Sequence, residues 1–280
     1  MKTIISIHLI FTFVAFLCLG CANERTTPTV TAIYPSSDTL PENLLRMYVR
    51  FSQPMKTVGN LENIQLLDDS GQKGEGAIFN YVHELWDTEQ KQLTFLFDPA
   101  RVKTGLNANE SFGRALQPGR SYRLLIKDLA DVNHRKMSQA IIKEMKISAA
   151  DTLAPAIDRW EIIVPEAQSK MPLIVRFPDM LDQQSLKYRL KVVTSSGKAI
   201  SGTVRLGEQE KSWTFTPAQK WGRGDYQLLV NGRLEDPAGN NLNGLFDHKV
   251  GSRKYVREGE ILYKEFTVGE QLKKVPDEKQ

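Results

Sequence analysis

The stretch that decides the fold is Met47-Tyr48-Val49-Arg50-Phe51-Ser52-Gln53-Pro54-Met55. Its first half places Met47, Val49 and Phe51 at alternate positions, with more polar residues between them. A two-residue period of this kind is typical of a β-strand that buries one face. We therefore expect Phe51 to point into a core and Arg50 to point outward. Segments 173–177 and 190–192 alternate in the same way.

The same stretch returns later as Ile174-Val175-Arg176-Phe177-Pro178-Asp179-Met180-Leu181. Two further segments also return in the same order: 93–99 matches 212–217, and 116–124 matches 221–228. Three ordered matches predict an internal duplication. The first copy is longer, because 71 residues separate Phe51 from Tyr122 but 49 separate Phe177 from Tyr226. The extra sequence lies mostly in 83–87 and 101–114.

Short alternating segments and frequent turn dipeptides predict an all-β fold made of two tandem β-sandwich domains. Helical periodicity is weak and confined to segments such as 138–146 and 182–186. The predicted organisation follows the order of the chain: a signal peptide over 1–20, a tether over 21–29, a first domain with an insertion over 30–150, a second domain over 151–268 and a flexible tail over 269–280.

The repeated motifs resemble the bacterial Ig-like domain family associated with surface-layer proteins. The resemblance rests on segments 51–55, 122–126, 226–230 and 236–240, and it covers nearly all of 30–268. The first copy departs from the family pattern at 131–134, and the second departs at 177–180. The resemblance implies tandem Ig-like sandwiches, which mostly serve as spacers or as adhesive and binding modules. It implies no activity, since fold alone does not fix function.

The amino-terminal segment predicts export. Lys2 precedes an almost wholly apolar run over 4–19, and Gly20 then stands directly before Cys21. This is the order of a secretory signal peptide, and its Gly-Cys end resembles a bacterial lipoprotein signal in which Cys21 is acylated. Cys18 departs from that pattern, because the family has leucine three residues before the acylated cysteine. Ordinary cleavage and an uncleaved anchor are the alternatives. The predicted location is the cell envelope, lipid-anchored, at the outer membrane and facing the periplasm or the surface.

Composition narrows the class of protein. The 280 residues include 37 Lys and Arg against 33 Asp and Glu. Of these charged residues, removal of the signal peptide takes away only Lys2. The charges are interspersed, so nucleic acid is not an expected partner. The cysteines are Cys18 and Cys21, so no disulfide is expected in the folded part, and stability must come from apolar cores. The expected partners are the membrane, through the lipid on Cys21, and an envelope protein or a glycan.

The densest chemistry lies at His83-Glu84-Leu85-Trp86-Asp87. Glu84, Trp86 and Asp87 are candidates for ligand binding, to a sugar or a metal, but a strand edge followed by a turn is the favoured interpretation. Zinc sites need three or four ligands at fixed spacing, and no second histidine pairs with His83. Trp221 is a further candidate for ligand binding, as an exposed platform on which a sugar ring stacks; burial of its side chain is the more common alternative. Trp213 is expected in the core.

Two other segments carry weaker candidates. The run with Asp236, Asn240 and Asp247 is rich in oxygen ligands for calcium, but it lacks the spacing of an EF-hand and a glutamate at the twelfth position. The run 98–105 offers Arg101 and Lys103 to an anion, but its favoured interpretation is a turn in which Asp98 caps free amides.

No set of residues has the pattern of a catalytic triad, and no cofactor is implied. The sequence therefore predicts a non-catalytic envelope lipoprotein that acts as a binding or spacer module. The alternative is a surface lipoprotein that binds a glycan through the insertion of the first domain.

Overall fold

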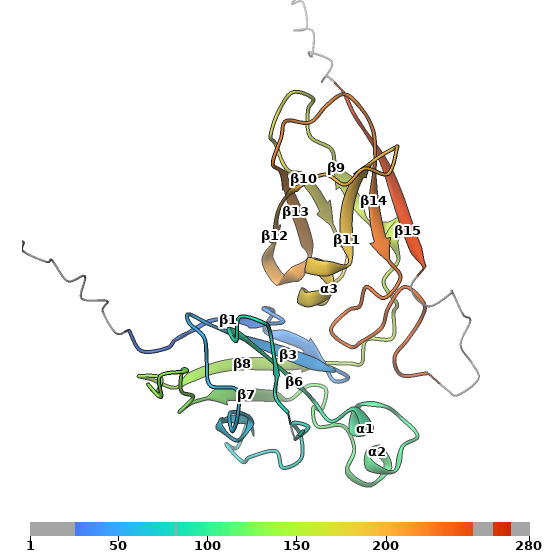
Figure 1. The fold of residues 1–280 in the computed structure, drawn as a ribbon. Coiled ribbons are helices and arrows are strands. Elements are labelled where there is room, and N and C mark those ends of the chain that lie inside the picture. Colours follow the sequence, from blue (N-terminus) through green and yellow to red (C-terminus); the bar gives the residue numbers. More distant parts are fainter. Residues whose placement is uncertain (1–25, 82, 249–259, 270–280) are drawn as a thin grey trace, which may run out of the picture.

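The computed structural model describes residues 26–81, 83–248 and 260–269. Figure 1 shows two β-rich bodies stacked on each other, with strands β1 to β8 in one body and β9 to β15 in the other. The fold is all-β, as predicted: four sheets contain every named strand of these residues. Cys21 lies outside the described residues, so the lipid anchor stays a prediction. No described helix is long and apolar enough to cross a bilayer.

The first body is a sandwich of two four-stranded sheets, with strand orders β1-β3-β6-β5 and β2-β8-β7-β4. All of its ladders are antiparallel except the one between β2 and β8. Its strands are β1 (Val30–Tyr34), β2 (Thr39–Pro41), β3 (Arg46–Phe51), β4 (Ile64–Asp68), β5 (Leu85–Trp86), β6 (Gln92–Leu96), β7 (Ser121–Ile126) and β8 (Ile141–Ser148).

Strand β3 shows why this sequence makes a sandwich. Met47, Val49 and Phe51 are buried in the first hydrophobic core, while Arg50 is exposed. Met47 lies opposite Phe95 and Val49 lies opposite Leu93 in the ladder with β6, so the apolar faces of the two strands coincide. The predicted inward positions are confirmed for this strand, but Tyr48, at an outward position, is buried as well.

The second body pairs a four-stranded sheet, β12-β13-β10-β9, with a three-stranded sheet, β11-β14-β15. Helix α3 (Gln183–Tyr188) closes the end of this body that faces the first sandwich (Figure 1). The strands are β9 (Glu161–Ile163), β10 (Leu173–Arg176), β11 (Leu190–Thr194), β12 (Gly202–Leu206), β13 (Ser212–Pro217), β14 (Gly224–Asn231) and β15 (Ile261–Val268).

The three sequence matches fall on equivalent strands of the two sandwiches. Strand β3 corresponds to β10, and β6 corresponds to β13. The ladder between β3 and β6 is antiparallel, and so is the ladder between β10 and β13. Strand β7 corresponds to β14, and each is an inner strand of its sheet: β7 lies between β8 and β4, and β14 lies between β11 and β15. Phe177 is buried and Arg176 exposed, as Phe51 and Arg50 are. The duplication therefore extends from sequence to topology.

The helices are short. They are α1 (Pro99–Val102), α2 (Asn107–Phe112) and α3, with 3₁₀ turns η1 (Leu61–Asn63), η2 (Ile157–Arg159) and η3 (Glu208–Glu210). Helix α3 agrees with the periodicity expected over 182–186. The weak helical periodicity over 138–146 does not correspond to a helix, because most of that segment forms β8, whose pairing with β7 overrides a weak local preference.

Candidate functional site

The residues singled out at 83–87 line an open cleft of about 630 Å³ on the first sandwich. The cleft lies where the segment after β3 and the segment around β5 meet. Its walls include Thr57, Asn80, Tyr81, His83, Trp86 and Gln90. The volume falls within the range of about 300–1,000 Å³ that is common for ligand sites.

Glu84 builds the wall of this cleft. Its Oε1 accepts hydrogen bonds from the backbone N–H groups of Asn60 and Leu61, and its Oε2 accepts from Asn60 Nδ2 at 2.7 Å and from Trp86 Nε1 at 3.0 Å. The carboxylate thus ties the loop before η1 to β5. A carboxylate with this many donors is a structural group and has little capacity left for a ligand.

Asp87 has a comparable role in the turn that follows β5. Its Oδ1 accepts from the backbone N–H groups of Lys91 at 2.7 Å and Gln92 at 3.0 Å. The favoured interpretation of 83–87, a strand edge and turn, therefore matches the structure. Glu84 and Asp87 lie close in sequence, but each serves a separate set of backbone donors.

The rings of Trp86 and Tyr81 are the part of the cleft suited to contact a ligand. Trp86 is half-buried, with its centroid 5.7 Å from that of Phe51, and its N–H is used by Glu84. The Tyr81 hydroxyl donates to Thr94 O at 3.0 Å, and burial raises the pKa of this phenol to about 12. Because the polar atoms of both rings are occupied, the rings offer mainly their apolar surface, next to the amides of Asn80 and Gln90.

Trp221 does not take part in this cleft. Its side chain is only 2% exposed, and its ring contacts Phe215, Tyr226 and Phe266 within the second core. Its Nε1 donates to Met171 O at 2.8 Å. The candidate role as an exposed stacking platform is therefore corrected: Trp221 is a core residue, as Trp213 is.

The calcium candidates are committed to protein donors. Asp236 accepts from the backbone N–H groups of Ala238 and Asn240 and from Asn240 Nδ2. Asp247 instead accepts from the Thr104 hydroxyl at 2.8 Å and from the Arg114 guanidinium at 2.8 Å. The described ranges contain no group of three or more His, Cys, Asp or Glu side chains placed to hold a metal ion. These residues make two separate structural contacts, so the structure gives the calcium hypothesis no support.

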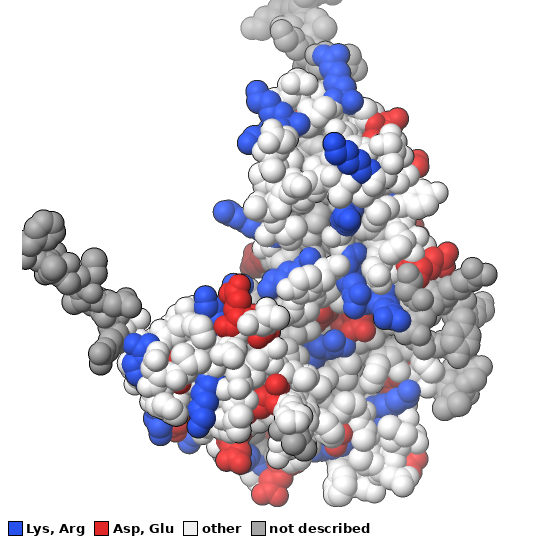
Figure 2. Space-filling view, viewed as in Figure 1, with Lys and Arg blue, Asp and Glu red and all other residues white. Residues whose placement is uncertain are grey.

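The run 98–105 is a structural turn as well. Asp98 caps α1 by accepting from Ala100 N at 2.9 Å. Arg101 donates to three backbone carbonyls, those of Glu75, Phe112 and Gly113. These contacts use the guanidinium internally and disfavour the anion site considered for Arg101. Figure 2 shows both signs of charge interspersed on the visible face of the molecule.

The sequence did not reveal the contact between the two sandwiches, which contains several buried polar and charged side chains. We call this region the seam: Ser36, Asn43, Leu45, Arg46, Tyr48 and Arg114 of the first sandwich, Asp151 of the linker, and Asp182, Glu210, Glu235–Asn240 and Asp247 of the second. The Tyr48 hydroxyl donates to Asp182 Oδ2 at 2.6 Å. Arg46 forms an ion pair with Glu235, and Ser36 N donates to Glu210 at 2.9 Å.

The turn at 236–240 is inserted into this seam. Leu45 N donates to Pro237 O at 2.9 Å, and a side chain at Gly239, whose φ is +82°, would meet Leu45 at 2.7 Å. Glycine is therefore required there both for its left-handed backbone and for its lack of a Cβ. The motif that carried the family resemblance thus forms a contact between the sandwiches in addition to a tight turn.

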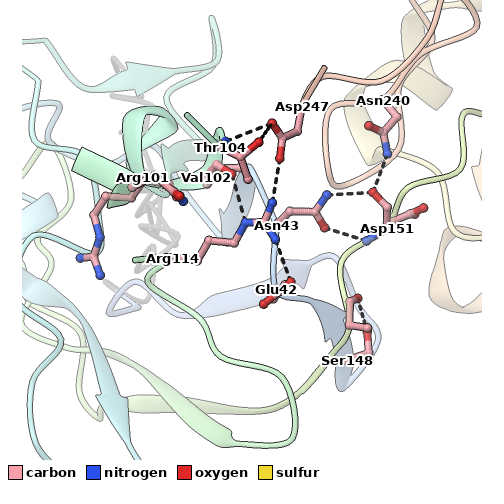
Figure 3. A network of polar contacts seen from close by, with 12 residues as sticks. Glu42, Asn43, Arg101, Val102, Thr104, Arg114, Ser148, Asp151, Asn240 and Asp247 are labelled. Atoms are coloured by element: carbon pink, nitrogen blue, oxygen red, sulfur yellow. Dashed lines mark hydrogen bonds and ion pairs between the residues drawn. The ribbon is translucent and has the colours of Figure 1, made fainter. Parts of the chain in front are cut away.

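The linker is held by two amide side chains, those of Asn43 and Asn240 (Figure 3). Asn43 bonds both backbone groups of Asp151 at 2.8 Å, and Asn240 Nδ2 reaches the same carbonyl at 3.3 Å. Nearby, Arg114 bridges Glu42 at 2.7 Å and Asp247 at 2.8 Å. The insertion of the first copy thereby contacts the second sandwich.

Burial shapes the ionisation of the seam. Desolvation, with a smaller effect of the Asp151 charge, raises the pKa of Asp236 to about 8. Desolvation also raises the pKa of Glu210 and of Glu235, although Arg46 opposes the shift at Glu235. The second sandwich therefore presents three carboxyl groups that are costly to ionise, and the contacts with Ser36 and Arg46 only partly offset the desolvation of Glu210 and Glu235.

No protein-family model matches this chain, and no curated protein is similar to it in sequence. Solved structures are similar at low identity. Domains MG0-NIE-MG1 of native alpha-2-macroglobulin from Escherichia coli are 12% identical, with a TM-score of 0.27, over 87% of this chain and 72% of that one.

Two further solved structures give similar values. The surface-layer protein SbsC is 8% identical, with a TM-score of 0.32, over 87% of this chain and 41% of that one. SGBP-B of a Bacteroides ovatus mixed-linkage glucan utilization locus was solved with a mixed-linkage heptasaccharide. It is 13% identical, with a TM-score of 0.23, over 74% of this chain and 44% of that one. Scores this low carry no argument about what this chain binds.

Proposed function

We propose that this chain is a non-catalytic, lipid-anchored protein of the bacterial cell envelope. In this proposal two Ig-like sandwiches, 30–150 and 151–268, act together as one binding or spacer body above the lipid on Cys21. The observation that carries it is the buried polar seam. The contacts of Tyr48 with Asp182, Arg46 with Glu235 and Ser36 with Glu210 would all be lost if the sandwiches separated, so they favour one docked body.

The carboxylates support a non-catalytic role. Those that first suggested chemistry, Glu84, Asp87 and Asp236, accept hydrogen bonds from several N–H groups each. A general acid or nucleophile needs an oxygen free to reach a substrate. These three groups instead hold turns, which is the work expected of a scaffold.

The anchor is tested by fractionation. The wild-type chain and Cys21→Ala are expressed in the same bacterial host, and membranes are separated from soluble protein. The wild type should remain with the membranes and incorporate labelled fatty acid, and Cys21→Ala should lose both properties. Cys18→Ala is the matched control and should behave as the wild type. Retention of unlabelled Cys21→Ala in the membranes would contradict the anchor.

The cleft at Trp86 favours a second candidate function, binding of a glycan. The supporting observation is the combination of two ring surfaces with amide side chains in an open cleft of oligosaccharide scale. A glycan array probed with the full-length protein tests this candidate. His83→Ala and Trp86→Phe should lose the signal, and Phe112→Ala, an aromatic residue 75% exposed outside the cleft, should keep it. An array with no signal for the wild type leaves the spacer role as the proposed function.

A further inference from the structure

The tether joins the first sandwich at one defined place. Thr29 N donates to Ser52 Oγ at 3.1 Å, and Ser52 N donates to Thr29 O at 2.9 Å. These bonds fix the last residue of the tether against the loop that follows β3. Thr29 stands eight positions after Cys21, and an extended chain spans at most about 3.6 Å per residue, or about 29 Å in all. A lipid on Cys21 therefore keeps this loop close to the bilayer.

A second loop lies beside the first. Val132 N donates to Pro54 O at 3.2 Å, which joins the turn before β8 to the loop after β3. We call these two loops, 52–58 and 130–136, the tether end. Each presents an apolar tip to solvent, because Val58 is 71% exposed and Val132 is 49% exposed. In Figure 1 the described chain begins at this end of the first sandwich, away from the second sandwich.

The charges of the tether end are mainly positive. Its charged residues are Lys56, Asp131, Arg135 and Lys136. Arg135 neutralises Asp131 at 2.7 Å, which leaves the two exposed lysines. The adjoining turn at 88–91 adds no net charge, since Glu89 pairs with Lys91 at 3.6 Å. Lysines beside exposed apolar side chains suit an anionic lipid surface, where ammonium groups contact phosphates and apolar tips enter the headgroup layer.

The anchor reduces the affinity that such a contact needs. Two valines and two lysines would bind a bilayer weakly from solution. A lipid on the same chain makes the contact intramolecular, at an effective concentration of about millimolar for a short flexible linker. A protein partner would instead need about 800 Å² of surface on each side, which two valine tips on separate loops do not supply. The lipid surface is therefore the favoured occupant.

We propose that the tether end lies on the lipid headgroups of the membrane that holds Cys21, with Val58 and Val132 as the side chains that enter the headgroup layer. This inference rests on the proposed anchor, since the anchor alone keeps the tether end near a bilayer. It adds an orientation to the proposed function. The cleft at Trp86, whose walls include Thr57 and Val58, then lies next to the membrane surface.

Tryptophan fluorescence on vesicles tests the proposal. The lipidated full-length protein is reconstituted into vesicles of phosphatidylethanolamine and phosphatidylglycerol, with or without a lipid that carries a nitroxide quencher on its headgroup. Trp86 is a native reporter, because it lines the cleft together with Val58, whereas the other three tryptophans lie in the second core. The quencher should dim the wild type, and Trp86→Phe should lose most of that quenching.

Substitutions at the two tips identify the surface. Val58→Asp and Val132→Asp should each lower the ratio of docked to undocked protein by up to about tenfold, which is the effect of returning one valine side chain to water. The double variant should therefore lose most of the quenching, with an unchanged urea midpoint because both side chains are exposed. Phe112→Asp is the matched control. Phe112 is 75% exposed on α2, which follows the opposite end of β6, so quenching should not change.

Flotation of the vesicles separates failure of this inference from failure of the anchor. Protein that floats with the vesicles but is not quenched keeps the anchor and overturns the proposed surface. Quenching that the double variant leaves unchanged overturns it too, because the tether alone would then bring Trp86 near the lipid. An equal loss in Phe112→Asp has the same meaning. Protein that does not float refutes the anchor, and the inference with it.

Discussion

The hydrogen bond between Tyr48 and Asp182 offers the sharpest test of the seam. Tyr48 Oη lies 2.6 Å from Asp182 Oδ2, and both side chains are buried. Asp182 Oδ1 is held separately, since it caps α3 by accepting from Ser185 N at 2.8 Å. Tyr48→Phe therefore removes one bond between the sandwiches and leaves the cap in place. A hydrogen bond to a charged acceptor contributes about 1.5–3 kcal/mol, so we expect a loss of about 2 kcal/mol.

The assay is equilibrium unfolding in urea, followed by tryptophan fluorescence. Three of the four tryptophans, Trp160, Trp213 and Trp221, lie in the core of the second sandwich. A substitution in the first sandwich should therefore lower the midpoint reported by the second. Tyr263→Phe, at an exposed tyrosine, should change the free energy of unfolding by less than about 0.5 kcal/mol.

A double-mutant cycle with Asp182→Asn isolates the pair. The coupling free energy should be about 1.5–3 kcal/mol, because each single substitution breaks the same charged bond. A coupling energy below about 0.5 kcal/mol would refute the reasoning, since that is the scatter expected for independent sites. Two fluorescence transitions, the later one insensitive to Tyr48→Phe, would refute it as well.

Three further predictions concern the seam and the second core. The pKa of Asp236 is raised to about 8, so the folded protein holds this proton more tightly than the unfolded chain does. The contribution of this group to stability should therefore be greatest below about pH 4 and should fall as the pH rises through 8. Asp236→Asn should flatten that decline in urea midpoints measured from about pH 5 to about pH 9. Gly239→Ala should cost at least about 1–2 kcal/mol in the same assay, from its φ of +82° and the contact at 2.7 Å with Leu45, and an unchanged midpoint would show that the turn is not seated in the seam. Trp221→Ala should lower the free energy of unfolding by about 3–5 kcal/mol and leave the glycan-array pattern unchanged. A selective loss of array signal with normal stability would instead support a role for Trp221 as a ligand platform.

The sequence predicted much of the architecture from local patterns. Alternation around Phe51 and Phe177 located the central strands, because the side-chain period of a strand is two and one face of each sheet is buried. Turns are also built from residues close in the chain: Tyr226 donates its hydroxyl to Gly222 O at 3.1 Å, and Gly239 has a φ of +82°.

The seam could not be predicted in the same way, because it depends on contacts between residues far apart in the chain. Tyr48 stands at a position that alternation assigns to the outer face of β3, yet it is buried because the second sandwich covers that face. Asp236 reads as an ordinary turn residue, and its burial follows only from the docking of the turn at 236–240 against Leu45. At 83–87, the sequence singled out residues that line the cleft, but it could not show that Glu84 accepts from the backbone of Asn60 and Leu61, since those donors belong to a separate loop.

The insertion of the turn at 236–240 has a consequence for biogenesis. A ribosome completes every strand of the first sandwich by residue 148, almost ninety residues before that turn exists. During that interval Leu45, Arg46 and Tyr48 are not yet covered by the second sandwich and remain exposed to solvent. Docking of the turn at 236–240 against Leu45 is therefore a late step of folding, because it needs the second half of the chain.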